Sequence, residues 1–117
     1  MPDTNLRTNV RRLDPYTSLI DLEGDVSGFA EPILMEAFTQ ACGEKTRTII
    51  LNFAGLDYMN SSGIGLLVTL LIRAQRQKQR LMACGLTDHY RQIFELTRLN
   101  EAIGIYAGEP EALAALN

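Results

Sequence analysis

The chain contains little of what several classes of functional site require. It has two cysteines, one histidine and no tryptophan. Cys42 and Cys84 stand alone without a C-x-x-C pair, so we interpret both as reduced, small hydrophobic residues, with a disulfide as the alternative. One histidine and two distant cysteines are too few ligands for a closed zinc site. The sequence therefore predicts no metal and no cofactor.

An excess of basic charge and a long apolar run are also missing. The formal net charge is −3, whereas proteins that bind nucleic acids through charge carry an excess of Lys and Arg. The longest nearly apolar run, residues 64–72, is much shorter than the roughly 20 residues of a membrane span. Residues 1–5 lack the apolar core of a signal peptide. We therefore expect a cytoplasmic protein with no membrane span and no direct nucleic-acid contact.

What the chain does contain is typical of a globular protein. Hydrophobic residues make up 46% of the sequence and charged residues 21%, which favours a packed core over disorder. A length of 117 residues suits one domain, residues 1–117. No repeat, low-complexity segment or Pro/Gly linker divides it.

Hydrophobic periodicity predicts strands that alternate with helices. The predicted strands cover residues 7–13, 17–22, 46–53, 81–85 and 103–106, with the second ending at Gly24 and residues 55–59 forming a connection. The predicted helices begin at Ser27, Ser61, Thr87 and Gly108, and Asn100 is a plausible stop for the third. This order predicts an α/β fold with a single mixed, mostly parallel sheet of four to five strands and about four helices.

The segment from Asn60 to Gly65 (Asn-Ser-Ser-Gly-Ile-Gly) follows the central strand and begins the longest predicted helix, which ends near Arg76. In parallel sheets the carboxyl ends of the strands form the usual functional edge. Ser61 could cap the helix while Gly63 and Gly65 allow close packing at its start. Alternatively, a phosphate on a serine would be tolerated at the positive end of the helix dipole and would repel a docked partner.

Enzymatic interpretations of this segment lack partners in the sequence. A G-x-S-x-G nucleophile elbow is absent, and Gly63-x-Gly65 has neither the third glycine of a dinucleotide loop nor the lysine of a P-loop. His89, the one histidine, is interpreted as a surface residue at a helix end. We therefore predict no catalytic residues. Four carboxylates near strand ends are interpreted as a solvated rim that could shape a protein-binding face: Asp21, Glu23, Asp25 and Asp57. The basic residues at the end of the long helix are interpreted as a solvated end.

Three stretches resemble the motifs of the STAS domain, the fold of bacterial anti-sigma factor antagonists. Residues 22–25 (Leu-Glu-Gly-Asp) resemble the opening motif of the family, and residues 51–66 resemble its central signature. Residues 93–99 are similar to a later apolar segment of the family. The resemblance extends from about Arg7 to Leu116.

The resemblance implies a function and a switch. In the family, the unphosphorylated antagonist binds an anti-sigma factor that is also a GHKL-type serine kinase, and a PP2C-type phosphatase reverses the phosphorylation that ends binding. The modified serine matches Ser61, with Ser62 as the second choice. Two carboxylates of the family pattern are replaced here by Asn60 and Ser27, which removes negative charge near the site.

The resemblance also implies a partner-binding surface around this loop. Its expected members are Asp25, Ser27, Met59, Asn60, Ser61, Ser62, Gly63, Ile64 and Leu66. Exposed apolar atoms of Met59, Ile64 and Leu66 are expected to supply contact area. The alternative function is a constitutive STAS interaction module in a signalling complex, without a phosphoswitch. The oligomeric state is left open, a homodimer included.

Overall fold

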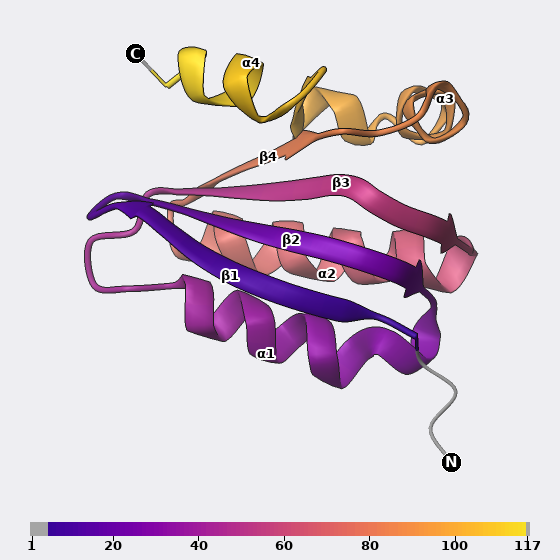
Figure 1. The fold of residues 1–117 in the computed structure, drawn as a ribbon, viewed down its shortest axis with the longest axis horizontal. Helices are drawn as coiled ribbons and strands as arrows, with labels where there is room; N and C mark the ends of the chain where they lie inside the picture. The colour runs from indigo at the N-terminus through magenta and orange to yellow at the C-terminus, as the bar shows by residue number, and fades with distance from the viewer. Residues whose placement is uncertain (1–4, 117) are drawn as a thin grey trace.

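A computed structural model describes residues 5–116 as alternating strands and helices (Figure 1). The strands are β1 (Arg7–Asp14), β2 (Thr17–Val26), β3 (Thr48–Met59), β4 (Arg80–Cys84) and β5 (Gly104–Tyr106). The helices are α1 (Glu31–Ala41), α2 (Ser61–Arg76), α3 (Asp88–Leu96) and α4 (Glu109–Ala114), with short 3-10 turns η1 (Gly28–Ala30) and η2 (Leu99–Glu101). The predicted α/β fold with one mixed sheet is confirmed.

The five strands form one sheet in the order β1-β2-β3-β4-β5. β1 and β2 form an antiparallel hairpin, and every other neighbouring pair is parallel. Because β2 and β3 are parallel, their carboxyl ends lie at the same edge of the sheet, where η1 and α2 begin (Figure 1). We call this edge the serine edge, because Ser61 is the first residue of α2.

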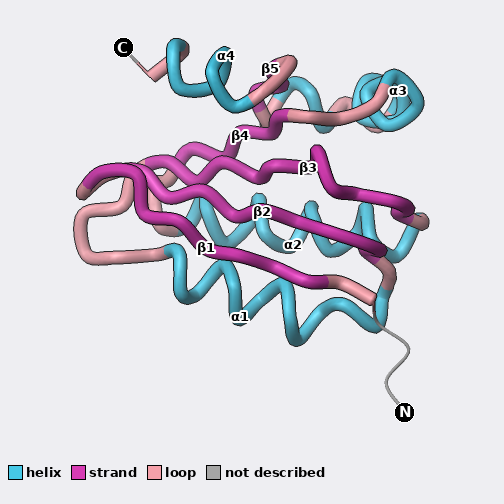
Figure 2. The backbone as a smooth tube through the Cα atoms, viewed as in Figure 1, coloured by secondary structure: helices cyan, strands magenta, loops and turns pink. Residues whose placement is uncertain are grey.

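Hydrophobic side chains form a core on each face of the sheet. Helices α1 and α2 cover one face (Figure 2), and their core with the sheet includes Ile49, Leu51 and Phe53 of β3. Phe94 of α3 belongs to the same core. The opposite face carries a smaller cluster, in which Ala112 of α4 packs with Leu19, Ile50, Met82 and Cys84.

Two strands are longer than the sequence indicated. β2 continues past Gly24 to Val26, because Gly24 adopts a φ of 97° at an irregularity in the pairing with β3. β3 continues through residues 55–59, for which the sequence pattern predicts a connection. Gly and Asp are poor strand formers, but the extended β2 supplies pairing as far as the contact between Val26 and Met59.

Two helix boundaries differ from the predicted ones, at the start of α1 and at the end of α3. Ser27 precedes the 3-10 turn η1, and α1 itself begins at Glu31. The predicted cap position of α3 is confirmed, since Thr87 is its N-cap residue, although its side chain makes no capping hydrogen bond. α3 ends at Leu96, before the predicted stop at Asn100, and Arg98 follows with a left-handed φ of 63°.

Candidate functional site

The first turn of α2 is capped by Asn60. Its side-chain Oδ1 accepts a hydrogen bond from the Gly63 N–H at 2.9 Å, and its carbonyl accepts one from the Ile64 N–H at 3.0 Å. The interpretation of Ser61 as the cap is therefore wrong by one residue. Because Asn60 performs this role, the hydroxyl of Ser61 is not needed to start the helix.

Both serines of the loop are exposed, but their surroundings differ. Within residues 5–116, neither hydroxyl makes a hydrogen bond. The Cβ of Ser62 lies beside η1, 3.4 Å from the point where a Cβ on Gly28 would stand. The structure thus brings Ser62 next to η1, the turn that follows Ser27. Asp25 lies at the same edge, paired with Tyr58 of β3.

Gly63 allows α2 to approach the end of β2 closely. A Cβ at this position would lie 2.1 Å from the Val26 carbonyl oxygen and 2.9 Å from the Cγ of Met59. The same carbonyl accepts a hydrogen bond from the Asn60 N–H at 3.3 Å. Gly65 differs, because a Cβ there would meet nothing within 4 Å. The expectation of close packing is therefore confirmed for Gly63 and wrong for Gly65.

The apolar surface at the serine edge differs from the expected one. Met59 is only 4% exposed and Leu66 8% exposed, because both side chains belong to the core beneath α1 and α2. Ile64 is partly buried against the same core. The large exposed apolar side chains are instead Phe29 (66%) on η1 and Tyr58 (52%) on β3.

Neither of these two aromatic side chains was predicted from the sequence, in which only Tyr58 carries a signal. Tyr58 alternates with the buried Met59 along β3 and must therefore face the other side of the strand. Its prediction required knowing that residues 55–59 form a strand. Val68 and Ile72 are also exposed, at helical spacing along α2 from Ser61 and Gly65.

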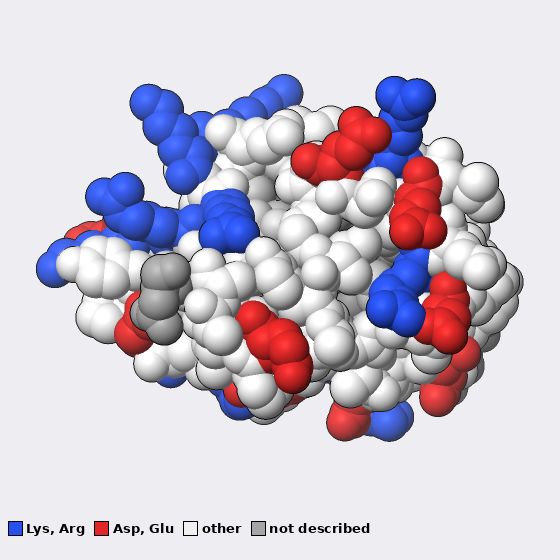
Figure 3. Space-filling model, turned by 90° about the horizontal axis from the view of Figure 1, so that it is seen from above, with Lys and Arg blue, Asp and Glu red and all other residues white. Residues whose placement is uncertain are grey.

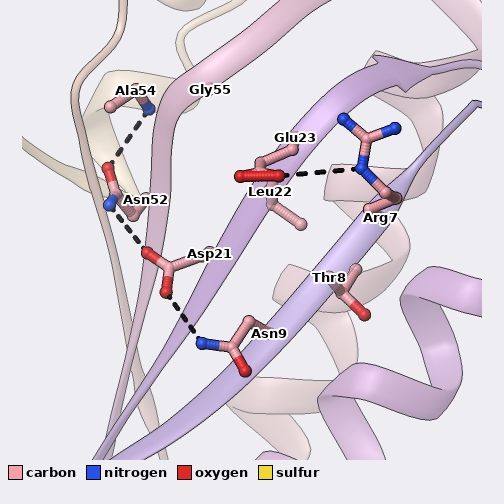
Figure 4. A pocket seen from close by; sticks show the side chains of 9 residues that line it. All are labelled: Arg7, Thr8, Asn9, Asp21, Leu22, Glu23, Asn52, Ala54 and Gly55. Carbon is pink, nitrogen blue, oxygen red and sulfur yellow. Dashed lines mark hydrogen bonds and ion pairs between the residues drawn. The ribbon is translucent and has the colours of Figure 1, made fainter.

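A hollow of about 280 Å³ lies over β1, β2 and β3, lined in part by Asn9, Asp21 and Asn52 (Figure 4). Asp21 had been assigned to a solvated rim, which is wrong. Its carboxylate accepts hydrogen bonds from Arg11 at 2.8 and 3.0 Å and from the Asn52 amide at 2.8 Å. The Arg11 hydrogen bond is the main cause that lowers the pKa of Asp21. Since these polar groups hydrogen-bond to one another, the hollow is lined by a connected network of hydrogen bonds.

Other candidate chemistry is sparse in the part of the chain that the structure describes. It holds no group of three or more His, Cys, Asp or Glu side chains placed for a metal. Cys42 and Cys84 are free thiols, and burial raises the pKa of Cys84 to about 11. Among residues 5–116, no helix is both long and apolar enough to cross a bilayer.

Basic side chains gather toward the end of the molecule where the chain turns from β1 into β2 (Figure 3). Lys45, Arg47 and Lys78 line a hollow of about 460 Å³ there, together with Glu44. The interpretation of the basic helix end as solvated fits the exposed Lys78. Arg73 differs, because its guanidinium lies 5.0 Å over the ring of Phe38.

The chain belongs to the STAS domain family, because the model of that family matches residues 7–112. It is 28% identical over 89 residues to the anti-sigma-B factor antagonist of Staphylococcus aureus (strain NCTC 8325 / PS 47). The aligned residues cover 76% of this chain and 82% of that protein.

Solved structures share the fold. An anti-sigma factor antagonist from Mycobacterium paratuberculosis matches with a TM-score of 0.81 at 18% identity, over 98% of this chain and 96% of that chain. The phosphorylated form of the Bacillus cell fate determinant SpoIIAA matches with a TM-score of 0.68 at 23% identity, over 95% of this chain and 100% of that chain.

Proposed function

We propose that this chain is an anti-sigma factor antagonist whose binding is switched off by phosphorylation of Ser61. Its partner is an anti-sigma factor that is also a GHKL-type serine kinase, and a PP2C-type phosphatase restores the unmodified form. The observation that carries the proposal is the exposed, unbonded hydroxyl of Ser61 at the first position of α2. The names of the relatives point to the same class of partner.

The electrostatics of the helix start support a switch that leaves the fold intact. A phosphate on Ser61 would add about −1.5 to −2 charges beside the unpaired N–H groups of the first turn, which favour an anion. The same charge would lie on a surface with the exposed rings of Phe29 and Tyr58. A partner docked there would lose contact through the cost of desolvating the phosphate.

The replacement of the family carboxylate by Asn60 is compatible with this proposal. The cap requires one side-chain oxygen as acceptor for the Gly63 N–H, and the amide supplies it at 2.9 Å. An amide also places no negative charge beside the phosphate, so it would repel the modified serine less than a carboxylate would. Ser27 is the N-cap residue of η1 but makes no side-chain capping hydrogen bond, so this turn forms without help from that side chain.

Mass spectrometry after incubation with the cognate kinase and ATP tests the site of modification. We expect one phosphate on the wild-type chain and on Ser62→Ala, and none on Ser61→Ala. Ser62→Ala is a matched control, since its hydroxyl is the neighbouring one. Labelling that persists in Ser61→Ala, or no labelling of the wild type, would remove Ser61 from this role.

Partner capture with two variants separates the switch from a constitutive interaction module. Ser61→Asp places a carboxylate in the first turn of α2, where an acidic residue stabilises a helix by about 0.3–1 kcal/mol, so the fold should persist. We expect this variant to bind the anti-sigma factor more weakly than the wild type, while Ser61→Ala binds normally. Equal binding by all three proteins would support the constitutive module instead.

A further inference from the structure

The end of β3 has a strand neighbour on one side only. β4 pairs with β3 from Thr48 to Asn52, whereas β2 continues along the other side as far as Met59. The Asn60 N–H donates to Val26 on the β2 side. Because successive N–H groups of a strand point in opposite directions, the Met59 N–H points to the side that β4 has left. A buried N–H in this position needs another acceptor.

Tyr90 of α3 supplies that acceptor. The Met59 N–H donates to the Tyr90 hydroxyl oxygen at 2.9 Å, and the two residues are 4% and 8% exposed. α3 is itself anchored by Phe94, whose ring packs edge-to-face on Phe53 of β3 with the ring centres 6.2 Å apart. A side-chain hydroxyl from a helix 31 residues away therefore replaces the missing strand. The amide that it holds belongs to the residue two positions before Ser61.

We propose that Tyr90 is a positioning residue for the phosphorylation of Ser61, an inference that rests on the proposed function. Its hydroxyl holds the backbone of Met59 from one side while Val26 holds Asn60 from the other. Together these two hydrogen bonds define where Asn60 caps α2 and where the Ser61 hydroxyl stands. Without the Tyr90 hydroxyl, the Met59 N–H has no acceptor and the strand end is held from one side.

The variant Tyr90→Phe tests the role of this hydroxyl, because it keeps the ring and its packing. Tyr106→Phe is a matched control that removes the same atom elsewhere. The Tyr106 hydroxyl accepts a hydrogen bond from the exposed Arg80 side chain at 2.9 Å, and Arg80 begins β4 whereas Cys84 ends it. Two quantities are measured on the purified chain of residues 1–117. These are kcat and KM for phosphorylation of Ser61 by the kinase, and the hydrogen-exchange rate of the Met59 amide by NMR.

For Tyr90→Phe we expect kcat to fall about tenfold with KM little changed, since misplacing a reacting hydroxyl by a fraction of an ångström affects the chemical step. We also expect exchange of the Met59 amide to accelerate about tenfold, because its hydrogen bond is lost. Tyr106→Phe should change neither quantity. A loss of kcat confined to Tyr90→Phe, with faster Met59 exchange, supports the positioning role.

Three results would overturn the proposal. Unchanged Met59 exchange in Tyr90→Phe would show that the hydroxyl does not hold the amide. Faster exchange with unchanged kcat would show that the hydrogen bond is structural only. An equal loss of kcat in Tyr106→Phe would indicate a general effect of losing a hydroxyl. A wild-type chain that is not labelled at Ser61 contradicts the proposed function itself, and the Met59 exchange rates still decide whether Tyr90 holds the strand end.

Discussion

At the scale of single residues, the start of α2 depends on two groups with different tasks. Asn60 provides the acceptor that begins the helix, and Gly63 provides the space in which the helix meets Val26. Neither task involves the hydroxyl of Ser61. This separation allows a serine to be modified at a helix start without removing the groups that hold the helix in place.

The two glycines of the loop should respond in opposite ways to the same added methyl group. Gly63→Ala would place a Cβ 2.1 Å from the Val26 carbonyl oxygen, so we expect the free energy of unfolding to fall by about 1–3 kcal/mol. Gly65→Ala meets nothing within 4 Å and replaces a poor helix former in α2, so it should stabilise the protein by about 0.5–1 kcal/mol.

Urea unfolding of both variants, followed by circular dichroism, measures these changes. The pair is internally controlled, because the two substitutions are chemically identical and lie two residues apart in the same helix. A Gly63→Ala variant as stable as the wild type would mean that α2 can move away from Val26 at little cost.

At the scale of secondary-structure elements, Arg11 joins parts of the fold that are distant in sequence. From β1 its guanidinium donates to Asp21 of β2 at 2.8 and 3.0 Å and to Glu109 of α4 at 2.8 and 3.2 Å. Asp21 continues the network to Asn52 of β3. The Arg11 side chain thus connects the edge strand β1 to β2 and to α4, which covers the face of the sheet opposite α1 and α2.

Replacing Arg11 by methionine should lower the free energy of unfolding by about 1–3 kcal/mol, because it leaves two carboxylates without their charged donor. Arg12→Met is the matched control: Arg12 is exposed and makes no ion pair among residues 5–116, so its loss should cost less than about 0.5 kcal/mol. Thermal or urea unfolding at neutral pH compares the two. Equal stabilities would show that the Arg11 network contributes nothing measurable.

The stability difference between the wild type and Arg11→Met should depend on pH in a defined way. The pKa of Asp21 is lowered in the folded state from its ordinary value of 3.8, chiefly by the Arg11 hydrogen bond. A lowered folded-state pKa contributes stability above about pH 4, and this contribution is lost as the pH falls through the folded pKa. The stability difference between wild type and Arg11→Met should therefore be constant above about pH 5 and shrink below pH 4. A difference that grows toward acid would contradict this assignment.

At the scale of the whole molecule, two cores share the same central strands. β3 sends Leu51 into the core beneath α1 and α2 and Ile50 into the cluster beneath α4. Neither core can lose its strands without exposing the other. We therefore predict that the chain behaves as a single STAS domain that unfolds in one step.

Urea unfolding followed by two probes checks this prediction. The chain contains four tyrosines and no tryptophan, so its intrinsic fluorescence comes from tyrosine, including Tyr90 in one core and Tyr106 against the other. Fluorescence and far-ultraviolet circular dichroism should give the same midpoint and the same slope, about 1–3 kcal/mol/M. Separate midpoints would show that α4 and its cluster detach before the rest.

Sequence by itself determined the order of strands and helices, the α/β class and the place of Ser61 at the start of α2. These features are local, because hydrophobic periodicity and helix-start chemistry depend on residues a few positions apart. Only the tertiary structure decided that β3 reaches Met59, that Met59 and Leu66 are buried, and that Gly63 but not Gly65 is crowded. It alone revealed the contacts of Tyr90 and Arg11, since their partners lie far away in the chain and no local pattern connects them.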